Sequence, residues 1–336
     1  MKEAYLYGKL NNMRVRCDLC NHRCVIEDDE KGKCCVRKNS NGKLYTLVYR
    51  KLISENIDPI EKKPLFHFLP GSYSLSVATV GCNFNCFFCQ NHQISQAPCE
   101  SGKIAGRDIA PEEIVEHALK YNCNSISYTY TEPTIFFEYA YDIAKLASSH
   151  NIKNIFVSNG FMTRESIDMI EPFLDAANID LKSFSDKTYR EKIGGRLKPV
   201  LDNIEAMKEK GIWVEVTTLI IPGINSSKQE LKSIAEFLSD IDKSIPWHIS
   251  AYYPQYKSEL PATGIDIIES AIEIGKNTGL KYVYGGNIRD SRYENTICAK
   301  CGESILERSG FSIISNNMKN GKCNKCGEMT DGVFQN

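Results

Sequence analysis

The sequence has no hydrophobic run long enough to cross a membrane, and residues 1–12 lack the apolar stretch of a signal peptide. It also has almost no net charge, because 41 Lys and Arg residues are balanced by 42 Asp and Glu residues. This balance gives no field that would draw the protein to nucleic acid or to a lipid surface. No stripe of interleaved basic and aromatic residues is present either. These absences favour a cytoplasmic protein without a membrane partner and weigh against nucleic-acid binding.

Cysteine, in contrast, is abundant, with 14 residues in the chain. Five lie in residues 17–35, three in residues 82–89 and four in residues 298–326, which leaves only Cys99 and Cys123 apart. A reducing compartment keeps thiols unpaired, so we expect the cysteines to form no disulfides. Clusters at such short spacing instead indicate bound metal.

The middle of the chain alternates β-rich runs with amphipathic helical segments. Strands are expected at Ser74–Val80, Ser125–Thr131, Ile152–Ser158, Ala177–Lys182, Trp213–Ile221, Trp247–Tyr253 and Lys281–Tyr284, and helices at Pro111–Tyr121, Ile135–Ser148, Arg164–Leu174, Lys198–Lys210, Lys228–Asp240 and Ile265–Asn277. Repeated strand–helix units predict a parallel sheet covered by helices, and these units are too few for a closed eight-fold barrel. We therefore expect an α/β fold, a partial (β/α)6 TIM-like barrel in residues 71–290, with small Cys-rich modules in residues 1–70 and 291–336.

The central cysteines Cys82, Cys86 and Cys89 follow the first expected strand, where a parallel barrel places its catalytic loops. Three thiolates on one loop can bind three irons of a 4Fe–4S cluster. Because no fourth cysteine is nearby, one iron would keep an open position. Zinc is the alternative, with His92 as the fourth ligand that a structural zinc site needs.

The CxxxCxxC spacing, with an aromatic residue before the last Cys, resembles the signature of the radical S-adenosylmethionine (SAM) superfamily. Cys89-Gln90-Asn91 is similar to the Cys-His-Asn of the activating enzymes for pyruvate formate-lyase and other glycyl-radical enzymes. The resemblance implies an oxidoreductase with the partial barrel of that superfamily. Its 4Fe–4S cluster would bind SAM and cleave it reductively to a 5′-deoxyadenosyl radical that abstracts hydrogen from a substrate. Phe88 would then lie along the SAM adenine, and Asn91 would be a further SAM contact.

Further motifs follow at the ends of the next strands. Tyr130-Thr131-Glu132-Pro133 occupies the position of the superfamily's Gly-Gly-Glu-Pro, and Ser158-Asn159-Gly160 resembles the Thr-Asn-Gly of the activating enzymes. Asp180-Leu181-Lys182 resembles their Asp-Leu-Lys, in which the Lys faces the SAM carboxylate and the Asp lies near the ribose. The implied SAM contacts are therefore Thr131, Glu132, Ser158, Asn159, Asp180 and Lys182.

Val157 departs from the pattern of the activating enzymes, and Tyr253 adds a further candidate contact. Val157 stands where those enzymes carry an acidic residue of a monovalent-cation site, so no such site is expected here. Tyr253 lies near the place of their adenine-contacting His and is a candidate cofactor contact. His248, four residues earlier, is expected to be an ordinary half-buried histidine.

Two cysteine quartets lie outside the central region. Cys298, Cys301, Cys323 and Cys326 form two Cx2C knuckles, each followed by Gly-Glu, which is typical of a zinc ribbon with four Cys ligands. Rubredoxin-like iron is the alternative. Cys17, Cys20, Cys24 and Cys34 form the other quartet. Zinc and an auxiliary iron–sulfur cluster both fit four thiolates, and the knuckle-like arrangement slightly favours zinc.

The two ends of the chain extend the resemblance. The N-terminal cysteine motif, the string from Asp58 to Gly71 and the C-terminal ribbon resemble the radical SAM enzymes of the AmmeMemoRadiSam system. This implies two companion proteins, beside SAM and a reductant such as flavodoxin or ferredoxin, but no known substrate. A glycyl-radical-enzyme activase is one alternative function. A zinc-binding scaffold or nucleic-acid-associated protein with structural cysteines is an alternative of another class.

Overall fold

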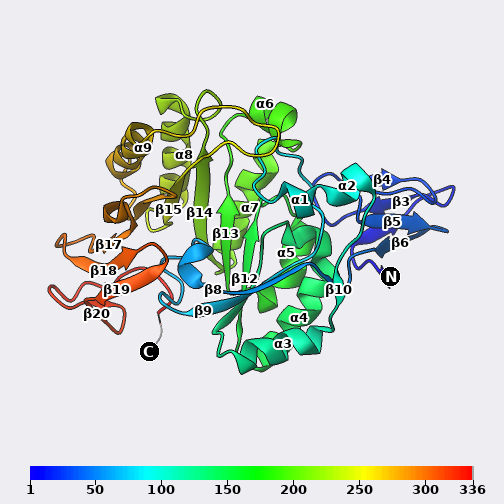
Figure 1. Ribbon diagram of the computed structural model, residues 1–336, viewed down its shortest axis with the longest axis horizontal. Coiled ribbons are helices and arrows are strands. Elements are labelled where there is room, and N and C mark those ends of the chain that lie inside the picture. The colour runs from blue at the N-terminus through cyan, green and yellow to red at the C-terminus, as the bar shows by residue number, and fades with distance from the viewer. Residues whose placement is uncertain (335–336) are drawn as a thin grey trace.

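An eight-stranded sheet forms the centre of the computed structural model, which describes residues 1–334 (Figure 1). Its strand order is β16-β15-β14-β13-β12-β11-β9-β8. The seven parallel strands are β9 (Tyr73–Ala78), β11 (Ser125–Tyr128), β12 (Lys153–Ser158), β13 (Ala176–Asp180), β14 (Trp213–Ile220), β15 (Trp247–Ala251) and β16 (Val283–Gly286). The pairing recorded within residues 1–334 leaves β8 and β16 as free edges, so the sheet is open. The predicted α/β fold with a partial barrel is confirmed.

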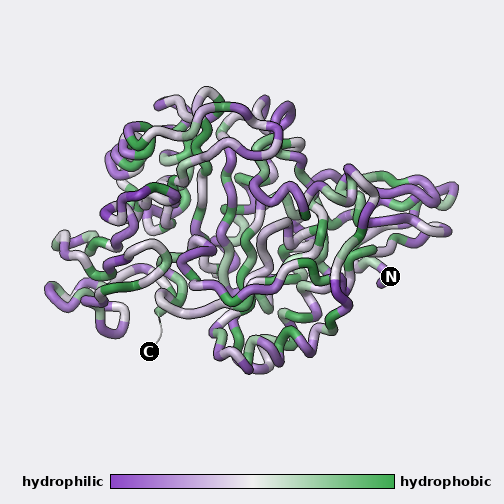
Figure 2. Tube along the Cα trace, viewed as in Figure 1, coloured by the Kyte–Doolittle hydropathy of each residue, from purple (hydrophilic) through white to green (hydrophobic). Residues whose placement is uncertain are grey.

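One helix follows most of the parallel strands and covers the sheet. These helices are α3 (Pro111–Lys120), α4 (Phe137–Ser149), α5 (Arg164–Ile170), α7 (Leu197–Glu209), α8 (Lys228–Ile241) and α9 (Ile265–Asn277). Helix α8 buries Leu231, Ile234 and Leu238, a spacing that places all three on the face toward the sheet. Figure 2 shows hydrophobic residues along the central strands and alternating with hydrophilic ones along the helices. Within the part of the chain that the structure describes, every helix falls short of the length and apolarity that a bilayer span requires.

Small sheets lie at opposite ends of the molecule (Figure 1). The N-terminal ones contain β1 (Lys2–Glu3), β6 (Lys43–Thr46) and β5 (Arg37–Ser40), then β2 (Tyr7–Lys9), β3 (Val15–Cys17) and β4 (Val25–Ile26). The C-terminal ones contain β17 (Thr296–Ile297), β18 (Ser304–Ser309) and β19 (Ser312–Asn316), then β20 (Met318–Lys319) and β21 (Lys322–Cys323). Strand β7 (Lys51–Leu52) pairs with β10 (Arg107–Asp108). Strand β8 (Ser54–Pro59) precedes the expected boundary at residue 70, yet it joins the central sheet antiparallel to β9.

A disulfide joins Cys35 to Cys99, so the expectation that all cysteines would be unpaired is wrong at these two positions. Cys99 lies in the short helix α2 (Ala97–Ser101), which follows α1 (His92–Ser95) just after the central cysteines. The fold brings the two Cα atoms within 5.3 Å of each other, inside the range that a disulfide can bridge. The bond ties the N-terminal module to the segment that follows the central cysteines.

Residues 60–69, which include the 3-10 turn η1 (Ile60–Lys62), pack against side chains of the sheet. The Glu215 carboxylate of β14 accepts hydrogen bonds from the backbone N–H groups of Phe66 (3.0 Å) and His67 (2.8 Å). The carboxylate also lies 2.6 Å from His248 Nε2. His248 is 5% exposed, so the expectation of an ordinary half-buried histidine is wrong: it is buried and paired with an acid. Burial alone would raise the pKa of Glu215, but its hydrogen bonds with His248 and Trp213 and the nearby histidine rings outweigh burial and lower it.

The C-terminal ribbon is fixed to this segment by Arg308 of β18, whose side chain is fully buried. Its guanidinium donates to the carbonyl oxygens of Phe66 (2.9 Å) and Glu294 (3.0 Å) and to the hydroxyl of Thr296 (2.8 Å). Glu61 is also buried, and its carboxylate lies 3.8 Å from the guanidinium. The ribbon is therefore docked through a buried cation whose partners come from both ends of the chain.

We expect Arg308→Ala to lower the free energy of unfolding by about 3 kcal/mol, because it leaves the buried Glu61 carboxylate without a counter-charge and the Phe66 carbonyl without its Arg308 donor. Denaturant titration followed by circular dichroism measures the change. Arg164→Ala is the matched control: its side chain is 52% exposed and its ion pairs are 3.4 and 4.0 Å long, so its effect should stay below about 0.5 kcal/mol. Equal effects of the two substitutions would contradict the docking role of Arg308.

Candidate functional site

The loop that carries Cys82, Cys86 and Cys89 begins directly after β9. Gly81 precedes the first cysteine with a φ of +108°, and a Cβ there would lie 2.8 Å from the Val36 side chain of the N-terminal module. Only glycine adopts this backbone conformation without strain and leaves that room. The start of the loop is therefore set by a close approach to the N-terminal module.

A π-helical turn, η4 (Tyr189–Ile193), supports the same loop from the other side. The N–H groups of Asn85 and Phe87 donate to the carbonyl oxygens of Ile193 (3.0 Å) and Lys192 (3.4 Å). Turns of this kind are rare and are often found beside functional sites. Here the turn fixes the backbone between the first and last of the three cysteines.

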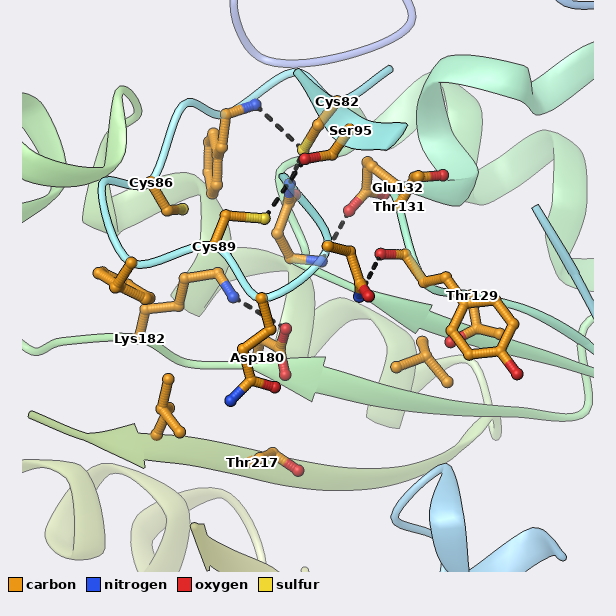
Figure 3. Close-up of a pocket in the computed structure, with 18 of the residues that line it drawn as sticks. Cys82, Cys86, Cys89, Ser95, Thr129, Thr131, Glu132, Asp180, Lys182 and Thr217 are labelled. Atoms are coloured by element: carbon orange, nitrogen blue, oxygen red, sulfur yellow. Dashed lines mark hydrogen bonds and ion pairs between the residues drawn. The ribbon is translucent and has the colours of Figure 1, made fainter. Parts of the chain in front are cut away.

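The three cysteines line one cavity of about 410 Å³ beyond the carboxyl ends of the parallel strands (Figure 3). Its volume lies in the range of small-molecule sites. Of the residues expected from the sequence, Phe88, Asn91, Thr131, Glu132, Asn159, Asp180 and Lys182 also line it. Ser158 lies behind the wall of the cavity, and Tyr253 is 49% exposed and elsewhere on the surface. The structure thus brings together residues from four successive strand ends.

The three sulfur ligands suit a 4Fe–4S cluster with one iron left open. Among the described residues, the lining of this cavity contains no fourth cysteine and no histidine. His92, the alternative fourth ligand of a zinc ion, instead stacks on the ring of Tyr256. Burial raises the pKa of the Cys86 thiol to about 12, with the nearby charge of Lys182 opposing it. A bound cation is therefore needed to hold this thiol as a thiolate.

Lys182 and Asp180 form an ion pair of 2.8 Å beside the cysteines, and Figure 3 shows the Lys182 side chain directed at Asp180. Burial alone would lower the pKa of Lys182, but the charge and hydrogen bond of Asp180, together with the thiolate form of Cys86, outweigh burial and raise it. The ammonium group is therefore charged at every physiological pH. It supplies a fixed positive charge in the wall of the cavity.

Glu132 acts as a buried clamp between the ends of β11 and β12. Its carboxylate accepts from the backbone N–H and hydroxyl of Thr134 (3.0 and 2.6 Å), the Ser158 hydroxyl (2.7 Å) and the Asn159 N–H (2.8 Å). Asn159 in turn donates through Nδ2 to Asn83 Oδ1 at 2.7 Å, next to Cys82. Ser158 thus contributes to the site by holding Glu132, and Glu132 fixes the loop that presents Asn159.

Known proteins identify the family of this chain. The family model of the Radical SAM superfamily matches residues 76–238. An uncharacterized protein of Methanocaldococcus jannaschii is 43% identical over 99% of this chain and 100% of its own length. A second protein of that archaeon, provisionally named a glycyl-radical enzyme activating enzyme, is 28% identical over 63% of this chain and 79% of its own length.

The chain belongs to the radical SAM superfamily. The crystal structure of a radical SAM methyltransferase from Sphaerobacter thermophilus has the same fold, with a TM-score of 0.51 and 16% identity over 70% of this chain and 71% of its own. Membership of the radical SAM superfamily implies a 4Fe–4S cluster and SAM. The three-cysteine cavity has a donor set that fits both.

Several residues that line this radical SAM cavity were not assigned a role from the sequence. They include Lys62, Lys63, Ser95, Thr217 and Ser250. Ser95 Oγ lies 3.3 Å from Cys89 Sγ. Burial lowers the pKa of Lys63 to about 8, and its bond to Asp58 opposes the effect of burial. Thr217 and Ser250 could have been predicted from the sequence, because they lie on the expected strands β14 and β15, and strand residues near the carboxyl edge of a parallel sheet face the site.

We expect Glu132→Gln to lower the free energy of unfolding by roughly 1–3 kcal/mol, because an amide NH2 would face one of the donors that the carboxylate now accepts from. Thermal and urea unfolding of the metal-free protein measure this loss without reference to activity. Glu116→Gln, on the exposed face of α3, is the matched control and should change stability by less than about 0.5 kcal/mol. A Glu132→Gln protein as stable as wild type would rule out the clamp.

Proposed function

We propose that this chain is a radical SAM oxidoreductase in which Cys82, Cys86 and Cys89 hold the 4Fe–4S cluster. The observation that carries the proposal is the convergence of these three thiols with Lys182, Asp180 and Asn159 on one cavity. The cluster and SAM together supply reductive cleavage of SAM, which gives methionine and a 5′-deoxyadenosyl radical able to take a hydrogen atom from a substrate.

The chain's own residues bind and orient SAM in this proposal. The Lys182 ammonium, kept charged by Asp180, attracts the carboxylate of SAM through a charge-assisted hydrogen bond. Asp180 is the acceptor on the ribose side. The Phe88 ring, which is 5% exposed, offers a flat apolar surface for the adenine. The burial of Phe88 and of most of the Lys182 side chain keeps water from that side of the bound SAM.

A one-electron donor such as flavodoxin or ferredoxin is the reductant that this function requires, and two companion proteins are expected from the resemblance to the AmmeMemoRadiSam system. A glycyl-radical-enzyme activase is the second candidate function. The name of the relative that is 28% identical supports it. Formation of a glycyl radical on a partner protein, detected by electron paramagnetic resonance, would favour the activase over an enzyme acting on a small molecule.

We expect Cys82→Ala, Cys86→Ala and Cys89→Ala each to abolish reductive cleavage of SAM, because loss of one thiolate leaves too few ligands for the cluster. The measurement is the amount of 5′-deoxyadenosine formed anaerobically with dithionite. Cys123→Ala is the matched control: Cys123 is also buried (6% exposed) but lies outside the cavity, so it should keep wild-type cleavage. Wild-type product from any of the three cavity variants would sink the assignment.

We also propose that the C-terminal quartet binds zinc. The sulfur atoms of Cys298, Cys301, Cys323 and Cys326 all lie within 4.8 Å of one another. The pairs Cys298–Cys326 and Cys301–Cys323 are 3.6 and 3.7 Å apart. Four thiolates around one zinc ion, each about 2.3 Å from the metal, need S–S separations of about 3.8 Å. Such a site has no open position, so its role is structural.

Zinc in the ribbon should survive exposure to air that bleaches the central cluster, because zinc has no redox chemistry. Metal analysis before and after air exposure, on wild type and Cys326→Ala, tests this. The variant should lose one equivalent of zinc and destabilise residues 291–336, whose core is small. Iron in the ribbon, or loss of its metal together with the cluster, would contradict the structural role.

A further inference from the structure

A second cavity lies in the N-terminal module, separate from the SAM cavity. Four cysteines line it: Cys17 at the end of β3, Cys20 and Cys24 in the following loop, and Cys34 before β5. All four are free thiols in the structure. The other polar residues of the lining are His22, Lys33, Arg37 and Asn83, and the rest of the lining is apolar apart from the thiols and Gly32. The His22 ring is already engaged, because its Nε2 lies 2.8 Å from the Asn83 backbone oxygen. Four thiols around one enclosed space form a complete ligand set for a metal centre.

The spacing of the sulfur atoms separates this quartet from the C-terminal one. Within residues 1–334, the C-terminal quartet is the one set of three or more potential ligand atoms that lie within 4.8 Å of one another. The N-terminal sulfurs are therefore more widely spaced, as are those of Cys82, Cys86 and Cys89. A single zinc ion requires the tight arrangement. A cluster of several irons and sulfides separates its thiolates further.

Two buried donors in the wall of the cavity have no partner within the described part of the chain. Arg37 is 1% exposed, and while its Nη2 binds Glu138, its Nε and Nη1 are unpaired. Asn83 is 5% exposed, and its Nδ2 is unpaired. Buried donors left without an acceptor are costly and rare. Thiolate and sulfide atoms of an anionic cluster would accept from both side chains, and the Arg37 charge would offset part of the cluster's negative charge.

Asn83 also places this cavity next to the central cysteines. Its backbone oxygen lies 2.8 Å from His22 Nε2 of the N-terminal loop. Its Oδ1 accepts from Asn159 at 2.7 Å and lies 3.8 Å from Cys82 Sγ. Asn83 thus lines the N-terminal cavity and contacts both the N-terminal loop and the first central cysteine.

We propose that Cys17, Cys20, Cys24 and Cys34 hold a second iron–sulfur cluster, fully ligated by cysteine. This replaces the slight preference for zinc that the knuckle-like sequence suggested. With four thiolates the cluster has no open iron, so it does not bind SAM. The inference concerns metal content alone and stands or falls independently of the proposed function.

The test uses the full-length chain carrying Cys82→Ala, Cys86→Ala and Cys89→Ala together, which removes the central ligands and leaves the N-terminal quartet intact. After anaerobic reconstitution with iron and sulfide, we expect about four iron and about four sulfide per chain, against about eight of each in wild type. Visible absorbance of an iron–sulfur cluster should remain. Zinc at one equivalent above the ribbon's, without sulfide, would overturn the proposal, and so would an empty N-terminal site.

A second variant assigns the remaining iron to its ligands. Adding Cys17→Ser and Cys34→Ser to the triple variant should remove both iron and sulfide, because two of the four ligands are lost. Adding Cys123→Ala instead is the matched control and should leave them unchanged. If the five-fold variant does not fold, the triple variant by itself still decides: about four iron with about four sulfide supports the second cluster, and zinc at this site without sulfide contradicts it.

Discussion

The parallel pairing of neighbouring strands is the constraint on which the site depends. Val77 of β9 pairs with Tyr128 of β11, Tyr128 with Phe156 of β12, and Ser158 of β12 with Ile179 of β13. Because these strands run the same way, the segments that leave their carboxyl ends meet at one edge of the sheet. This edge of the sheet brings together groups from separate parts of the sequence. They are the three central cysteines, Glu132, Asn159 and the ion pair of Asp180 with Lys182.

The strands and helices of the core could be predicted because each carries a local signal. Alternation of β-branched runs with amphipathic segments located all seven parallel strands and the six covering helices to within a few residues. The same signal placed Asp180 and Lys182 at a strand end and therefore beside the cysteines. The partial barrel followed from the number of units, since seven strands leave the sheet open.

Other features depend on contacts between distant segments, and sequence spacing carries no information about them. The disulfide joins cysteines 64 positions apart, one beside the N-terminal quartet and one in a short helix. Glu132 lines the cavity, and its carboxylate also accepts from donors in two separate loops, contacts that its motif does not reveal. Lys63 reaches the cavity because residues 60–69 pack against the sheet. The hydrophobic pattern of this segment does not predict that packing.

The contacts of residues 331–333 have a consequence for the order of folding. The carbonyl of Asp331 lies 2.7 Å from His67 Nδ1, a contact between positions 264 apart. Val333 exchanges backbone hydrogen bonds with His67 and Leu69. The region around His67 therefore lacks these partners until a segment 264 positions further along the chain has reached it. Contacts of such long sequence separation form slowly, so we expect this region to close later than the pairing of neighbouring strands.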